Sequence, residues 1–296
     1  MQDINSYDFK NKKAIIRVDF NVPLNESMEV TDATRINAAI PTINKVLENG
    51  GSVILMSHLG RPKGERIEKF SLKHIVAVLS SKLNLAVKFA NDCIGEEAKQ
   101  MSEDLKPGEV LLLENLRFYN EETNGDAMFA KKLSNLADVY INDAFGTAHR
   151  AHASTAIIAS YFEGHKMFGF VIENELEAIR NVIEKNQRPF TAIMGGAKIS
   201  DKILLIEKML DKVDNLIIGG GMSYTFFKAM GGQIGSSLVE EDKLSLAKTI
   251  LDLAKEKNVN LLLPSDSTIA SNFSNEAEIK TAENTSIDDN WMGLDI

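Results

Sequence analysis

Short apolar runs alternate along this chain with segments of helical periodicity, and this alternation restricts the possible fold more than any other feature. Seven runs are expected to form strands, at residues 14–18, 53–56, 110–113, 139–141, around 193, 216–218 and 261–263. Runs that are apolar on both faces are typical of a parallel sheet covered by helices.

Helical patterns separate these runs. The first follows Thr31 and Asp32, which can cap it, and stops at Asn49-Gly50-Gly51. The others lie at about residues 72–82, 127–136, 200–210 and 242–257. Repeated strand–helix alternation predicts βαβ units with right-handed crossovers, and therefore an α/β fold.

A long helical pattern at residues 173–186 has no strand pattern beside it, and Arg188-Pro189 interrupts it. A chain of 296 residues is also long for a single core. We therefore predict two doubly wound parallel-sheet (Rossmann-like) domains, residues 1–172 and 188–296, with a connector helix and hinge at 173–187. The alternative is an ordinary covering helix of one large sheet.

The formal net charge of -9 disfavours nucleic-acid and acidic-membrane partners. The single cysteine, Cys93, has no second cysteine to pair with inside the chain, which favours a reduced, cytoplasmic setting. We expect neither a signal peptide nor a membrane helix, because no sufficiently long apolar stretch occurs.

Cationic side chains gather after four of the expected strands, in residues 19–21, 57–62, 114–118 and 142–150 and at a nearby helix start. They are Arg35, His58, Arg61, Arg117, His149 and Arg150. In open α/β sheets ligands bind beyond the carboxyl ends of the strands, and guanidinium groups bind phosphate or carboxylate. Each arginine alone could be a surface ion pair, but four such strand ends together predict a small, multiply anionic substrate.

Two glycine turns mark the second half. Residues 195–198 (GGAK) and 219–221 (GGG) each follow a strand pattern and open a helix pattern. Glycine lets backbone N–H groups approach a phosphate, and Lys198 and Lys202 are spaced to share a helix face. This predicts a nucleotide phosphate site, although tight turns also need glycine without a ligand. Trp291 and the phenylalanines are expected in the core.

Several motifs are missing. The sequence contains no Walker A motif, G-x-G-x-x-G, CxxC, HExxH or G-x-S-x-G. A Rossmann-type dehydrogenase, a metal hydrolase and a serine hydrolase are therefore disfavoured.

Six segments together resemble the motifs of the phosphoglycerate kinase family, in that family's order. They are RVDFNVP (17–23), SHLGRPK (57–63), LENLRF (113–118), YINDAFGTAHRAHAS (140–154), GGAKISDK (195–202) and IIGGGM (217–222). The resemblance implies a two-domain glycolytic kinase that moves a phosphoryl group reversibly between 1,3-bisphosphoglycerate and ADP, giving 3-phosphoglycerate and ATP. It also implies a cytoplasmic monomer that uses Mg2+ with the nucleotide.

The resemblance carries over to individual residues. Substrate binding is implied for Asp19, Phe20, Asn21, Arg35, His58, Leu59, Gly60, Arg61, Arg117 and Arg150. Nucleotide binding is implied for Gly196, Ala197, Lys198, Lys202, Gly220 and Gly293. The catalytic role is assigned to Arg35, Lys198 and Lys202.

The family normally continues beyond the Gly293-Leu294-Asp295-Ile296 end with an NGP segment, a glutamate and a GGGD loop. The resemblance therefore implies that the second domain is incomplete and that the Mg2+ ligand lies in the absent portion. The alternative function is a non-catalytic, shortened form that only binds the anionic substrate.

Overall fold

The computed structural model describes residues 2–184 and 187–295. The chain divides into two compact units, Met1–Ile179 and Arg180–Ile296. The boundary lies inside helix α7 (Phe170–Glu184), and the last two residues of the predicted connector helix, 185 and 186, lie outside the described residues.

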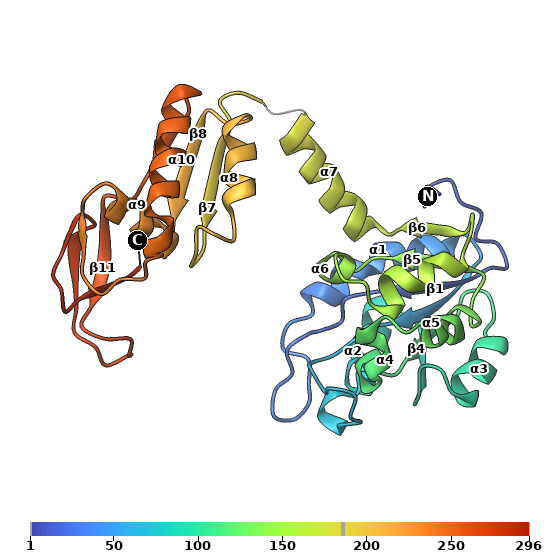
Figure 1. The fold of residues 1–296 in the computed structure, drawn as a ribbon. Coiled ribbons are helices and arrows are strands. Elements are labelled where there is room, and N and C mark those ends of the chain that lie inside the picture. The colour runs from blue at the N-terminus through green and yellow to red at the C-terminus, as the bar shows by residue number, and fades with distance from the viewer. Residues whose placement is uncertain (1, 185–186, 296) are drawn as a thin grey trace. The chain divides into compact units, whose positions relative to one another are not determined.

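The first unit is built on a six-stranded sheet of order β3-β4-β2-β1-β5-β6 (Figure 1). All of its strand pairs are parallel. The strands are β1 (Lys13–Arg17), β2 (Ser52–Met56), β3 (Val87–Ala90), β4 (Val110–Leu113), β5 (Val139–Asn142) and β6 (Lys166–Phe168).

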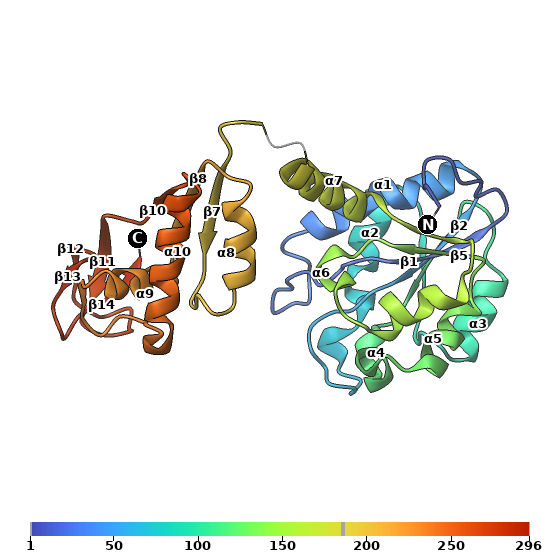
Figure 2. The same cartoon turned by 45° about the horizontal axis from the view of Figure 1, so that its top comes forward.

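Helices cover both faces of this sheet (Figure 2). Ile16 faces the core under α1 and α2, whereas its neighbour Ile15 faces the core under α3 and α5. The alternation follows from the period of two along a strand. The helices are α1 (Thr34–Glu48), α2 (Val76–Leu83), α3 (Glu96–Glu103), α4 (Asn120–Asn124), α5 (Ala127–Ser134), α6 (Phe145–Ala148) and the start of α7.

The second unit carries a parallel sheet of order β10-β8-β7 and an antiparallel sheet of order β12-β11-β14. Ile206, Phe226 and Ile250, one from each of its three helices, share one core. The helices are α8 (Ile203–Leu210), α9 (Met222–Ala229) and α10 (Leu244–Glu256). The strands are β7 (Thr191–Gly195), β8 (Asn215–Gly219), β9 (Gln233–Ile234), β10 (Asn260–Leu262), β11 (Asp266–Ala270), β12 (Ile279–Glu283), β13 (Ser286–Ile287) and β14 (Met292–Asp295).

The predicted fold class is confirmed, and each of the seven predicted strands is present within about one residue. The sequence analysis missed β3 and β6, which are the two edge strands of the first sheet, all of the antiparallel sheet, and the short parallel pair β9 and β13. Edge strands are short or polar on one side: β3 contains Lys88, and β6 has three residues. Such segments give no continuous apolar run.

Tyr140 links β5 to the helical turn Ala153–Ile157 that follows α6, and this link generates a stability prediction. Its buried hydroxyl lies 3.0 Å from the Ser154 carbonyl and 2.9 Å from the Thr155 carbonyl. We expect Tyr140→Phe to destabilise the first unit by about 1–3 kcal/mol, because buried carbonyls lose their donor. Urea unfolding of the intact chain measures this.

Tyr161→Phe is the matched control, because the Tyr161 hydroxyl also donates to a carbonyl, that of Ala127, but at an exposed position. It should change the free energy of unfolding by less than about 0.5 kcal/mol. Equal effects of the two substitutions would contradict the importance of the buried link.

Candidate functional site

A cavity of about 310 Å³ opens at the carboxyl edge of the first sheet, and most of its polar lining is cationic. Its lining residues are Arg61, Lys63, Gly64, Arg117, Tyr119, Asn120, Thr123 and Arg150. No carboxylate is among them. Burial lowers the pKa of Arg117, and the neighbouring Arg17, Arg150 and Arg61 lower it further. Cations that crowd together without a carboxylate form a site for a multiply charged anion.

The loop after β2 is held by hydrogen bonds from three sides. The Gly60 amide donates to Asn21 Oδ1 at 2.8 Å, and Arg117 Nη1 donates to the Gly60 carbonyl at 2.9 Å. Asn115 Nδ2 donates to the Leu59 carbonyl at 2.8 Å. Gly60 has φ +63°, and the Phe70 ring lies directly against its Cα. Only glycine fits this position without a rearrangement.

Arg35 and Asp19 form an ion pair of 2.8 Å at the edge of the same sheet. The Arg35 side chain is 51% exposed, so its remaining N–H groups face solvent. Asp19 Oδ1 accepts from the Asn21 amide, which fixes the loop after β1. Arg35 is therefore oriented by a carboxylate and still able to contact a ligand.

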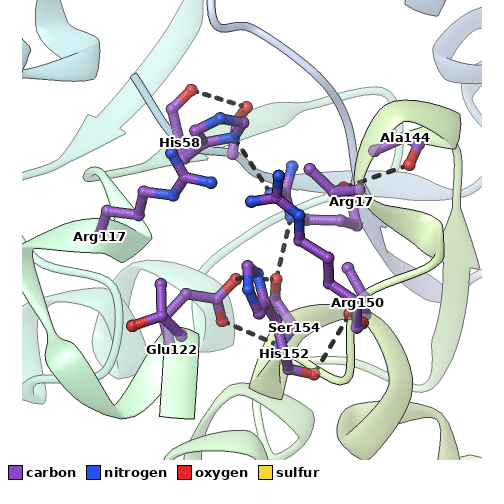
Figure 3. Close-up of polar contacts among 12 residues, drawn as sticks. Arg17, His58, Arg117, Glu122, Ala144, Arg150, His152 and Ser154 are labelled. Atoms are coloured by element: carbon purple, nitrogen blue, oxygen red, sulfur yellow. Dashed lines mark hydrogen bonds and ion pairs between the residues drawn. The ribbon is translucent and has the colours of Figure 1, made fainter. Parts of the chain in front are cut away.

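A buried network joins Arg17, at the end of β1, to the helical turn Ala153–Ile157 (Figure 3). Arg17 is fully buried; its Nε donates to Ser154 Oγ at 2.9 Å, and its Nη2 lies 3.2 Å from His58 Nδ1. Glu122, also fully buried, accepts from Ser154 Oγ at 2.6 Å and lies 3.9 Å from His152 Nδ1. Burial and the nearby Arg17 lower the pKa of His58 to about 2.

The structure brings most predicted substrate residues together, with two qualifications. The side chains of Phe20 and Leu59 are buried in the core cluster under α1 and α2, so only their backbones could face a ligand. The second qualification concerns Arg150, whose Nε donates to His149 Nε2 at 3.3 Å. The sequence analysis missed Lys63, Asn120 and Glu122, because they lie in polar stretches that resemble ordinary surface.

A second cavity, of about 550 Å³, lies in the second unit. Ala197, Gly220 and Gly293, all predicted nucleotide residues, line it together with Gly221, Tyr224, Ser236, Leu238, Phe273, Met292, Leu294 and Asp295. Glycine backbone meets apolar and aromatic side chains there, which suits a flat aromatic base next to phosphates. The expectation that every phenylalanine is core is wrong for Phe273, which is 86% exposed.

The two glycine turns of the second unit touch each other. A methyl group on Gly220 would lie 3.0 Å from the Gly196 backbone nitrogen and oxygen, and φ at Gly220 is +67°. The Met222 amide, at the start of α9, donates to the Gly196 carbonyl at 2.8 Å. Close backbone approach therefore requires glycine at Gly220.

The predicted helix that contains Lys202 is wrong at its start. Helix α8 begins at Ile203, and Lys202 is its N-cap residue, so Lys198 and Lys202 do not share a helix face. The amides of Ile199 and Ser200 donate instead to the Glu240 carboxylate. These hydrogen bonds to Glu240 take the place of the first helical turn that the periodicity predicted. Lys202 still lies beside the Gly196 turn, because its Cε is 3.0 Å from a methyl group built there.

Residues 2–184 and 187–295 contain no group of three or more His, Cys, Asp or Glu side chains arranged to hold a metal ion. No helix in the same ranges combines the length and the apolar character needed to cross a bilayer.

The α/β fold, the cationic cavity and the glycine-lined cavity suit a phosphotransferase. The sequence profile of the phosphoglycerate kinase family matches residues 3–296. The chain is 52% identical to a phosphoglycerate kinase of Porphyromonas gingivalis, over 99% of this chain and 76% of that protein. It is 53% identical to a cytosolic phosphoglycerate kinase of Triticum aestivum, over 98% and 72%.

The structure of phosphoglycerate kinase from Coxiella burnetii superposes with a TM-score of 0.83 and 39% identity, covering 98% of this chain and 73% of that one. The chain belongs to the phosphoglycerate kinase family. Its activity is the reversible transfer of a phosphoryl group between 1,3-bisphosphoglycerate and ADP. The family, the enzyme class and the function predicted from the sequence are confirmed.

The Gly60 contact gives a test of the loop after β2. We expect Gly60→Ala to lower kcat/KM for 3-phosphoglycerate roughly 10- to 100-fold, because the methyl group displaces the loop from Phe70. Steady-state kinetics measures the change. Gly108→Ala is the control: φ is +84° there too, but nothing lies within 4 Å of the added methyl group. A similar loss in both variants would mean that backbone strain, not the contact, is responsible.

Proposed function

We propose that the cationic cavity of the first unit holds the phosphoglycerate and that the glycine-lined cavity of the second unit holds the nucleotide. The observation that carries this proposal is the cluster of Arg61, Lys63, Arg117 and Arg150 around a cavity with no carboxylate in its lining. Asp19, Asn21, Arg35, His58 and the backbone of residues 58–60 complete the substrate site.

The reaction needs no general base. The nucleophile is the carboxylate of 3-phosphoglycerate, and a carboxyl group titrates near ~4, so it is already ionised at neutral pH. His58 is neutral, because its pKa is lowered to about 2. It therefore does not serve as a proton acceptor in the reaction.

Phosphoryl transfer requires alignment and positive charge around three equatorial oxygens. In this proposal Arg35 supplies that charge, because it is fixed by Asp19 at 2.8 Å and is still half exposed. Lys198 and Lys202 supply charge at the nucleotide phosphates, beside the Gly196 and Gly220 turns. Mg2+ is proposed to enter with the nucleotide, as the membership of the phosphoglycerate kinase family implies.

The segment at 173–187 is proposed as the hinge between domains 1–172 and 188–296. Asp143 Oδ1 accepts from the Val171 amide at 2.8 Å, and the Asn142 carbonyl accepts from the Gly169 amide at 2.9 Å. The loop after β5, which carries Arg150, is thereby tied to the start of α7. We also propose a cytoplasmic monomer, in line with the cytosolic Triticum aestivum relative.

Arg35→Ala tests the proposed charge stabilisation. We expect kcat to fall by about 10³ or more while nucleotide affinity is largely kept, because the arginine acts on the transferring phosphoryl group. Steady-state kinetics and nucleotide titration measure the two quantities. Lys99→Ala, an exposed lysine paired only with Glu96, should leave both unchanged. Unchanged turnover in Arg35→Ala would remove Arg35 from the mechanism.

Lys202→Ala tests the nucleotide half. We expect nucleotide affinity to fall roughly tenfold, because a charge-assisted contact to phosphate is lost, while 3-phosphoglycerate affinity is kept. Calorimetric titration with ADP measures it. Lys208→Ala, an exposed lysine on α8, is the matched control. Equal ADP affinity in the two variants would contradict the assignment of Lys202.

The function itself is tested by a coupled assay of the 296-residue chain with 3-phosphoglycerate and MgATP. Turnover that depends on both substrates supports the kinase reaction in this chain. A folded chain that binds 3-phosphoglycerate but shows no turnover would instead support the alternative, a form that only binds the anionic substrate.

A further inference from the structure

We infer that Arg17 is a positioning residue: it holds His58 in the neutral form protonated on Nε2, so that His58 presents an N–H donor to an anionic oxygen of phosphoglycerate. The inference deepens the proposed function and rests on it. It concerns a buried residue that does not line the cavity.

The first step is the direction of one hydrogen bond. Arg17 Nη2 lies 3.2 Å from His58 Nδ1, and Arg17 is fully buried. A guanidinium carries only N–H donors and no acceptor. His58 Nδ1 must therefore accept, which requires a lone pair on that nitrogen. A neutral imidazole with a lone pair on Nδ1 carries its proton on Nε2.

The second step concerns the other ring nitrogen. His58 as a whole is 4% exposed. Its Nε2 takes part in no hydrogen bond among the described residues. It is also not one of the fully buried side-chain atoms that lack a partner there, which are Asp143 Oδ2 and His152 Nδ1. Nε2 is therefore the ring nitrogen that reaches solvent and is left to meet a ligand.

The third step is how Arg17 is itself oriented. Its Nη1 donates to the Val18 carbonyl, and its Nε donates to Ser154 Oγ at 2.9 Å. The Ser154 hydroxyl then donates to Glu122 Oε1 at 2.6 Å, and the Ser154 amide donates to Glu122 Oε2 at 2.9 Å. These hydrogen bonds all run in one donor-to-acceptor direction, from Arg17 through Ser154 to the Glu122 carboxylate. The buried carboxylate thus fixes the guanidinium that fixes the imidazole.

The positive charges around His58 also favour its neutral form. Burial is the largest cause of its lowered pKa, and Arg17, Arg117, Arg35 and His152 all contribute positive charge on top of burial. A protonated His58 would also turn an N–H toward the N–H of Arg17. His58 consequently stays neutral over the pH range of the reaction, and the site gains a hydrogen-bond donor without another full charge.

The test is the protonation pattern of His58 in the intact 296-residue chain labelled with 15N-histidine. Two-bond 1H–15N spectra distinguish the Nε2–H form, the Nδ1–H form and the imidazolium. The signal is assigned by its loss in His58→Gln. In the unmodified chain we expect His58 to remain in the Nε2–H form from about pH 5.5 to 8.5.

Arg17→Met alone would leave the buried Glu122 carboxylate without the guanidinium charge that compensates it, which is expected to destabilise the fold. The informative variant is therefore the double substitution Arg17→Met/Glu122→Gln, with Glu122→Gln alone as the control that keeps Arg17 beside His58. In the double variant we expect a mixture of tautomers, an upward shift of the His58 pKa, and a rise of about tenfold in KM for 3-phosphoglycerate with KM for ATP unchanged. The control should keep the Nε2–H form.

A pure Nε2–H signal and an unchanged KM in the folded double variant would overturn the inference. His58→Gln separates this failure from failure of the proposed function. If His58→Gln raises KM for 3-phosphoglycerate while the double variant changes nothing, only the role of Arg17 is wrong. If His58→Gln also leaves KM unchanged, His58 does not bind phosphoglycerate and the assignment of the site fails.

Discussion

The crowding of guanidinium groups at one edge of a parallel sheet is the constraint on which the first unit depends. Arg61, Arg117 and Arg150 line one cavity, and Arg17 is fully buried. Burial lowers the pKa of Arg117, and repulsion by the neighbouring Arg17, Arg150 and Arg61 lowers it further. Two of these groups are held by separate acceptors: Arg117 donates to the Gly60 carbonyl, and Arg17 donates to Ser154 Oγ, which in turn donates to Glu122. A bound anion relieves the repulsion that remains.

The gathering of the candidate substrate residues at one edge of the sheet could be predicted from sequence, because their positions follow from topology. In a parallel sheet every strand points the same way, so residues that follow β1, β2, β4 and β5 meet at one edge. The apolar runs predicted where those strands end, and the family motifs identified the individual candidate residues. The tight turn at Gly220 could also be predicted from the sequence, because a close backbone turn, here with φ +67°, strains any residue other than glycine.

The supporting contacts could not be predicted in this way. Ser154 meets Arg17 across 137 positions of sequence and Glu122 across 32, and nothing in the local polar pattern around Glu122 marks it as fully buried. Lys202 was misplaced because the Glu240 carboxylate takes the amides at which a helix would begin. Phe273 was misread because an exposed aromatic side chain and a core one look alike in sequence. Tertiary contacts decided each case.

The most direct measurement is a calorimetric titration of the chain with 3-phosphoglycerate, without nucleotide, at low and at high ionic strength. If the cationic cavity is the substrate site, one equivalent binds, and the affinity falls as salt rises because several charge contacts are screened. A folded chain that binds no 3-phosphoglycerate, or binds it with an affinity indifferent to salt, would contradict the assignment.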